Sequence, residues 1–424
     1  MGLGLLDPVA AIVAAFCLLS LLLYKRVNLG ITLTATALVL GLLAVDWQDI
    51  PIIAYKTVDP STKNGLLALS VILATFGIMW LSQLYELTGQ MVKLSESASR
   101  LVKNPKILLS VLPAILGLLP VAGGALMSAP IVDAEAEKLK LKPERRVYIN
   151  VWFRHVILPI YPLSPMLITV AGLTGIPIFS IVLLQLPIFV AMAAVGFLLG
   201  FWRTTTPEKD KAGEAPVKKS SDLKDFAIAF SPMLTTVIVA VLISVSVRGF
   251  SEQGLDVLIA TFAGIVALAL ISRSGPKTLV KPLQGLSIYG VTLAVYGAFL
   301  LRNIMEAAGL SEILQPLVSG GSLNVTALLI AVTMIFSFLT GSPSGAIAVG
   351  VSILAGALTF TPKTSMLLYI SAYLGYNIAP THLCFTFTAD YFKTHIGKVY
   401  KYMIPSALAT FAAALMVYFL PFSM

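Results

Sequence analysis

Hydrophobic residues along this chain are gathered into long runs, and short polar segments separate the runs. A mostly apolar helix of about 20 residues crosses the roughly 30 Å hydrocarbon core of a membrane. Ten runs come close to this length or exceed it, and they cover residues 8–24, 29–46, 65–88, 147–174, 177–202, 226–247, 254–272, 286–308, 364–392 and 397–421. The pattern predicts an all-α polytopic membrane protein with ten transmembrane helices.

Two further apolar segments are interrupted by small residues. They lie within 107–135 and 324–358, and their centres read "LLPVAGGALMSAP" and "LTGSPSGAIAVG". Each limb beside such a centre is too short to cross the bilayer easily. We therefore predict two re-entrant hairpins, and their glycine-rich tips would let the backbone approach a ligand closely.

The composition agrees with a membrane protein that has little soluble mass. Hydrophobic residues make up 58% of the 424 residues, charged residues make up 12%, and the mean hydropathy is +0.92. Soluble domains carry about 25% charged residues. In a membrane protein a net charge of +9 arises from Lys and Arg residues in the loops, so no nucleic-acid partner is expected. Two cysteines in apolar runs, Cys17 and Cys384, exclude a disulfide scaffold.

Lysine and arginine gather on one side of the membrane when both hairpins enter and leave on the same face. Most of the 29 then share that face, and the exceptions are Lys56, Lys63, Arg154, Arg248, Arg302 and Lys363. This bias makes the shared face cytoplasmic. It places residues 203–225, interpreted as a flexible charged linker, in the cytoplasm and both termini outside an inner or plasma membrane. The N-terminal run, with no basic region before it, is interpreted as a first membrane helix.

The two halves of the chain resemble each other. The segment "YINVWFRHVILP" (148–159) aligns with "YISAYLGYNIAP" (369–380) at an offset of 221 residues. We therefore predict two repeats, 1–202 and 226–424, each with five spans and one hairpin. Because five is odd, the second repeat enters the membrane from the opposite side, and such inverted repeats are typical of secondary transporters.

Each repeat carries a proline inside a predicted span, Pro159 in one and Pro380 in the other. Proline removes a backbone donor and interrupts a helix. A broken helix at membrane depth is tolerated only where protein or a water-filled cavity covers it. Freed carbonyl groups can coordinate a cation, and half-helix N-termini can face an anion. We predict that the two breaks and the hairpin tips form one binding site.

Candidate substrate-binding residues lie at the hairpin tips and around the two breaks. They are Gly123, Gly124, Ser128, His155, Tyr161, Ser342, Ser344, Tyr376, Asn377 and His382. The alternative role for the glycines is close helix packing. The two histidines either titrate in a proton-coupled cycle, since histidine changes charge near neutral pH, or hydrogen-bond the freed carbonyl groups.

Two other features near the breaks leave alternatives open. The segment "HLC" (382–384) has weak spacing for a soft-metal site and no carboxylate close by, so no metal ligands are predicted. The guanidinium of Arg154 either binds an anion through its two-pronged fork or extends to the cytoplasmic surface. Its place near the cytoplasmic start of a span favours the surface.

The hairpins, broken spans and inverted repeats resemble the ion transporter superfamily. More closely, "GALMSAPIVDAEAEKL" (124–139) and "GYNIAPTHLCF" (375–385) resemble a prokaryotic membrane family, domain of unknown function 401, over nearly the whole chain. The resemblance implies a dimeric scaffold (1–88 and 226–308) and a transport part (107–174 and 324–392) that slides as an elevator. It also implies sodium sites at Gly123, Gly124, Ala125, Pro159, Ser342, Ser344, Gly345 and Pro380. The Ser-Asn-Thr tip signature of the dicarboxylate members is missing, so a dicarboxylate substrate is not implied.

The sequence thus predicts a secondary active transporter for a small organic anion, with an elevator mechanism and sodium or proton coupling. The alternative is an ion exchanger in which a histidine titrates. An intramembrane enzyme is not predicted, because HExxH, GxSxG and paired intramembrane carboxylates are missing. No cofactor is expected besides sodium as a coupling ion. A passive channel would differ by showing no saturable, gradient-driven accumulation.

The predicted topology can be tested by chemical labelling. A cysteine introduced within 203–225 should react with a membrane-impermeant maleimide only from the cytoplasmic side, because this segment lies on the face where most Lys and Arg residues gather. Labelling of intact cells from outside would overturn the topology.

Overall fold

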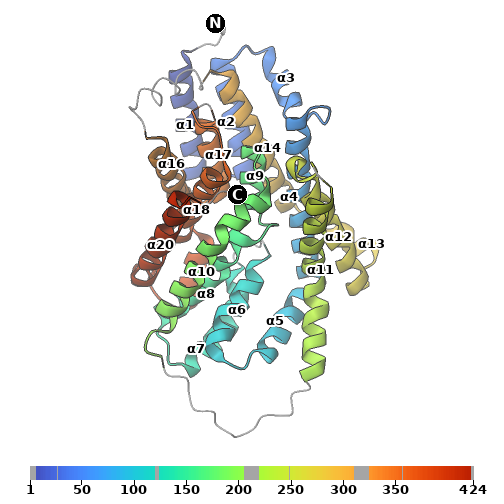
Figure 1. The fold of residues 1–424 in the computed structure, drawn as a ribbon, viewed down its shortest axis with the longest axis vertical. Helices are drawn as coiled ribbons and strands as arrows, with labels where there is room; N and C mark the ends of the chain where they lie inside the picture. The colour runs from blue at the N-terminus through green and yellow to red at the C-terminus, as the bar shows by residue number, and fades with distance from the viewer. Residues whose placement is uncertain are drawn as a thin grey trace.

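A computed structural model of the chain describes residues 6–25, 27–119, 124–204, 219–247, 249–309, 324–355 and 357–421. All regular secondary structure in these ranges is helical. Figure 1 shows an elongated bundle of helices, with α3 near one end and α5 and α7 near the other. The prediction of an all-α polytopic membrane protein is confirmed, and the count of ten transmembrane helices stays a prediction.

The helices follow one another in an order close to the predicted one. The first half contains α1 (Pro8–Tyr24), α2 (Leu29–Ala44), α3 (Asp49–Lys56), α4 (Lys63–Leu87), α5 (Gln90–Leu101), α6 (Pro105–Gly117), α7 (Ala125–Lys138), α8 (Pro143–Val156), η1 (Leu158–Ile160), α9 (Pro165–Thr174) and α10 (Ile178–Phe201). The second half contains α11 (Lys219–Ser246), η2 (Ser251–Gln253), α12 (Leu255–Ser272), α13 (Pro276–Val280), η3 (Lys281–Gln284), α14 (Leu286–Ala307), α16 (Val325–Thr340), α17 (Pro343–Leu354), α18 (Pro362–Ile378), α19 (Leu383–Tyr391) and α20 (Ile396–Phe419).

Seven stretches among the described residues are long and apolar enough to cross a membrane. They are α4, α8 with α9, α10, most of α11, α12, α14 and α20. Shorter apolar helices, α1 and α2, lie at two more of the predicted spans, and α6, α16 and α17 lie in the predicted hairpins.

One group of helices consists of α1, α2, α4, α11, α12 and α14, in which neighbours such as α1 and α2 pack together and α14 packs on the distant helices α2 and α4. Small residues allow a close approach between α2 and α14. A Cβ atom added at Gly30 would lie 2.7 Å from the backbone oxygen of Gly290, so a larger side chain there would push the helices apart. These helices come from the two segments predicted as the scaffold, and the scaffold role stays a prediction.

The second group contains the hairpins and the interrupted helices. The pair α6 and α7 forms one hairpin and packs on α8, while α16 and α17 form the other and pack on α18. The first interrupted helix runs from α8 through η1 to α9, and the second passes from α18 to α19 across residues 379–382. Both interruptions lie at the predicted prolines, Pro159 and Pro380.

Helix ends inside the bundle are capped by polar side chains from other helices. Each capped carbonyl lies in the last turn of a helix or just beyond it, where the regular helical donors run out. The donor–acceptor pairs are Arg154 with the oxygen of Leu119, Tyr373 with that of His155, Arg302 with that of Leu173, and Tyr400 with that of Ile378. The capping satisfies carbonyl groups that would be costly to leave unpaired in hydrocarbon.

The predicted linker is shorter than expected. Residues 205–218 lie outside the described residues, but α11 begins at Lys219, so the last part of 203–225 is helical rather than flexible. Asp222 explains the difference, because its carboxylate accepts a 2.7 Å hydrogen bond from Arg100 of α5. This ion pair ties the first turn of α11 to the neighbouring amphipathic helix.

The packing of the second hairpin leads to a stability prediction. A Cβ atom at Gly375 in α18 would lie 2.3 Å from the backbone oxygen of Met334 in α16. Replacing Gly375 by Ala should therefore lower the melting temperature of the purified protein, since overpacking costs about 1–3 kcal/mol. Gly275→Ala is the control, because nothing lies within 4 Å of the added atom. Equal melting temperatures for the two variants would contradict the close packing.

Candidate functional site

A cavity of about 310 Å³ lies where the first interrupted helix, the tip of the α16–α17 hairpin and the second interrupted helix meet. Its lining includes the end of α6 (Gly117 to Leu119), the α8–α9 segment (Arg154, His155, Leu158, Tyr161, Ser164, Pro165 and Met166), the hairpin tip (Gly341 to Ser344), and Tyr373, Tyr376 and Cys384. Residues more than 180 positions apart in the chain thus form one cavity. Five of the predicted substrate-binding residues line it: His155, Tyr161, Ser342, Ser344 and Tyr376.

Arg154 places a guanidinium in this cavity. Only 4% of the residue is exposed, so the expectation that it extends to the cytoplasmic surface is wrong. Its Nη2 atom donates a 3.2 Å hydrogen bond to the oxygen of Leu119, and Nη1 has no partner among the described residues. The physical reason is the end of α6, where the carbonyl group of Leu119 accepts this hydrogen bond inside the bundle.

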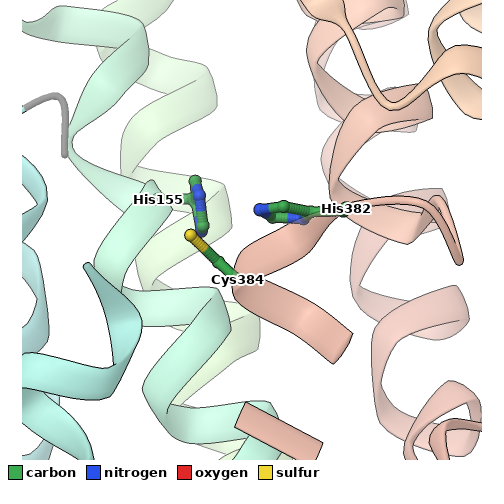
Figure 2. Close-up of side chains that lie close together, drawn as sticks. All are labelled: His155, His382 and Cys384. Carbon is green, nitrogen blue, oxygen red and sulfur yellow. The ribbon is translucent and has the colours of Figure 1, made fainter. Parts of the chain in front are cut away.

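Two histidines meet beside the cavity. The rings of His155 and His382 have centroids 4.7 Å apart and an interplanar angle of 77°. The ring of Tyr376 lies 3.8 Å from that of His382. Figure 2 shows that His155 comes from one interrupted helix, and that His382 and Cys384 come from the other. The sequence analysis located these histidines at the two breaks, and the fold brings them into contact.

The tip of the second hairpin reaches the break in the second interrupted helix. Gly341 adopts a left-handed conformation with φ of 64°, which glycine tolerates best. A Cβ atom there would lie 2.7 Å from Oγ1 of Thr381, within the break. Ser342 caps α17, and its hydroxyl accepts a 3.2 Å hydrogen bond from the backbone of Gly345. The tip therefore presents the N-terminus of α17 to the cavity.

In the first hairpin, the predicted binding residues that the structure describes do not line the cavity. Gly123 lies outside the described residues, and Gly124, Ala125 and Ser128 do not line the cavity. Ser128 donates a 2.5 Å hydrogen bond to the side chain of Asn150, whose amide donates a 2.8 Å bond to the oxygen of Ala125. These contacts fasten α7 to α8.

The remaining predicted residues lie near the cavity without lining it. Asn377 is buried in the last turn of α18, and neither atom of its amide has a partner among the described residues. Pro159 is buried within η1, whereas Pro380 is exposed in the break before α19. The substrate-binding role predicted for Asn377 and the sodium-binding role predicted for Pro159 and Pro380 stay predictions.

Sequence reasoning missed Tyr373 and Cys384, which both line the cavity. Tyr373 precedes Tyr376 by three residues, and this spacing puts both on one helix face, so a signal was available. Cys384 gave only a weak signal, as part of the segment "HLC" (382–384), because a cysteine in an apolar run is usually a small buried hydrophobe.

The fold and the cavity define a class of protein: an all-helical, multi-pass membrane protein with two interrupted helices and two hairpins around a cavity. The chain matches the family described as "Protein of unknown function (DUF401)" over residues 9–420, and it belongs to that family.

A solved structure shares this fold. The YdaH transporter of Alcanivorax borkumensis, whose structure is described as having an unusual topology, superposes with a TM-score of 0.63 at 16% sequence identity. The match covers 95% of this chain and 98% of that chain. No match was found among the curated proteins.

The hydrogen bond from Tyr373 to the oxygen of His155 leads to a prediction about the site. Replacing Tyr373 by Phe should destabilise the protein by about 1–3 kcal/mol, because a buried carbonyl group loses its partner. Tyr289→Phe is a matched control: Tyr289 also donates to a backbone oxygen, at 2.8 Å, but is exposed. Thermal unfolding in detergent measures both, and an equal effect would contradict the capping role of Tyr373.

Proposed function

We propose that this protein is a secondary active transporter that moves a small organic anion across an inner or plasma membrane. The observation that carries the proposal is the buried guanidinium of Arg154 in the cavity between the two interrupted helices. An ionisable group inside a membrane protein is costly and usually pairs with another charge or serves a function. None of the described residues that line the cavity is acidic, so an anionic ligand would supply the missing charge.

The end of α17 adds to the attraction for an anion. Ser342, Pro343 and Ser344 line the cavity at the first turn of this helix of 12 residues. The N-terminus of a helix carries partial positive charge and free N–H groups. A guanidinium fork on one side and a helix N-terminus on the other suit a carboxylate. The volume of about 310 Å³ lies at the lower end of small-molecule sites and favours a small substrate.

Transport requires the cavity to open to each side in turn. We propose that the hairpins and interrupted helices slide as one body against the group of α1, α2, α4, α11, α12 and α14, in an elevator mechanism within a homodimer. The two groups meet where α17 packs on α14 and α9 packs on α4. The shared fold with YdaH, which is described as a transporter, supports transport as the activity.

The coupling ion is proposed to bind where the hairpin tip meets the second break. The tip residues Ser342, Ser344 and Gly345, the Pro380 break, and the unpartnered amide of Asn377 provide oxygen atoms there. Oxygen ligands suit a hard cation such as sodium. A second candidate function, proton-linked ion exchange, is favoured by the contact between His155 and His382.

A ligand panel tests the anion proposal. The purified protein is heated with acetate, lactate, gluconate or citrate, each as a sodium salt and as an N-methylglucamine salt, at several pH values. A bound ligand raises the melting temperature by mass action. One anion should stabilise the protein, and more so with sodium. A shift with pH alone would instead favour the exchanger.

The Arg154→Gln variant should lose about 10- to 100-fold in affinity for that anion, the equivalent of a hydrogen bond to a charged group at about 1.5–3 kcal/mol. Arg302→Gln is the matched control, since Arg302 also caps a helix end, at 2.6 Å, but does not line the cavity. An unchanged affinity in Arg154→Gln would remove Arg154 from the site. Failure of proteoliposomes to accumulate the anion against a gradient would favour a channel.

A further inference from the structure

Three side chains that commonly bind metal ions converge where the two interrupted helices meet. His155 lies in the last turn of α8, His382 directly precedes α19, and Cys384 is the second residue of α19. All three are buried, and one ligand atom from each lies within 4.8 Å of the others. Figure 2 shows the two rings and the sulfur atom pointing toward one another.

His382 gives an independent reason to expect a ligand. The residue is 0% exposed, and neither ring nitrogen makes a hydrogen bond of good geometry within the described residues, where the backbone of Asn377 provides only a loose contact. Buried polar groups in native proteins are almost always paired, and an exception calls for an explanation. A metal ion bound to one ring nitrogen would provide one.

The hydrogen bonding of His155 suits the same role. Its Nδ1 atom lies 2.7 Å from the backbone oxygen of Val151. A carbonyl oxygen can only accept, so Nδ1 carries the proton and Nε2 keeps its lone pair. Histidines that bind metals usually donate their other ring N–H to a carbonyl or carboxylate in this way.

We propose that His155, His382 and Cys384 bind one zinc ion whose fourth position opens to the cavity. Thiolate and imidazole ligands together select zinc over harder cations such as magnesium or calcium. Zinc sites with three protein ligands leave a fourth position for water or substrate. His155 and Cys384 both line the cavity, so that position would face the same space as Arg154.

The arrangement needs a small closure to reach ideal geometry. Zinc–nitrogen and zinc–sulfur bonds of about 2.0–2.3 Å place ligand atoms closer together than 4.8 Å, by about 1 Å. His382 can supply this movement, because no hydrogen bond within the described structure holds its ring.

Zinc binding is tested on the full-length protein, purified without a polyhistidine tag and stripped with a chelator. Adding zinc chloride should raise the melting temperature, with saturation at one ion per chain by elemental analysis. Cobalt(II) in place of zinc should produce the absorption band of a thiolate–cobalt bond. Magnesium chloride should have no such effect, and all samples contain the same concentration of sodium chloride.

The chain provides a complete set of controls, because it contains 3 histidines and 2 cysteines. Cys384→Ser and His382→Ala should weaken zinc binding at least about a hundredfold, and Cys384→Ser should abolish the thiolate band. Cys17→Ser and His395→Asn remove the other cysteine and the other histidine, and both should bind zinc as the unchanged protein does. Each of these two residues lies outside the cluster.

The zinc proposal can be tested even if a cluster variant fails to fold, because the unchanged protein and Cys17→Ser both keep the cluster. A thiolate–cobalt band that persists in Cys17→Ser assigns the bond to Cys384 and supports the proposal. No band, or zinc stabilisation that is equal in Cys384→Ser, overturns it. This result is independent of the anion panel, because zinc binding is measured without a substrate and without a transport assay.

Discussion

The rest of this structure depends on one constraint: a backbone carbonyl group at a helix end inside the membrane needs a donor. Interrupting two helices and adding two hairpins creates several such ends in one place. Water is excluded from hydrocarbon, so the donors must be side chains from neighbouring helices. Arg154 and Tyr373 fill this role at the ends of α6 and α8, and each bond joins two helices.

The same polar groups also give the cavity side chains that can bind a ligand. Arg154 uses one nitrogen to cap α6 and leaves another without a partner among the described residues. Tyr373 donates a hydrogen bond to the backbone oxygen of His155 at the end of α8, and the ring of His155 contacts the ring of His382. A site of this kind arises where helices stop, because only there do polar side chains and free backbone groups meet inside the membrane. Structure and proposed function therefore share residues, and removing a capping group would disturb both.

Much of the fold was predictable because the relevant signals are local. Apolar runs located the spans, and Pro159 and Pro380 located the interruptions, since proline weakens a helix by removing a backbone donor. Proline alone does not decide where a helix stops, because Pro187 and Pro405 lie inside the continuous helices α10 and α20. The start of α11 was not predictable, because the bond between Asp222 and Arg100 joins residues that are distant in the chain. The burial of Arg154 was missed for a similar reason: its acceptor, Leu119, belongs to another helix.

The sequence by itself determined the all-helical membrane class, the two interruptions and the presence of polar residues beside them. These properties depend on hydropathy and backbone chemistry, which each segment carries alone. Only the tertiary structure decided that His155, His382 and Cys384 would converge, and that Ser128 would bond Asn150 instead of lining the cavity. Such choices depend on how whole helices pack and rotate against one another, and no single segment contains that information.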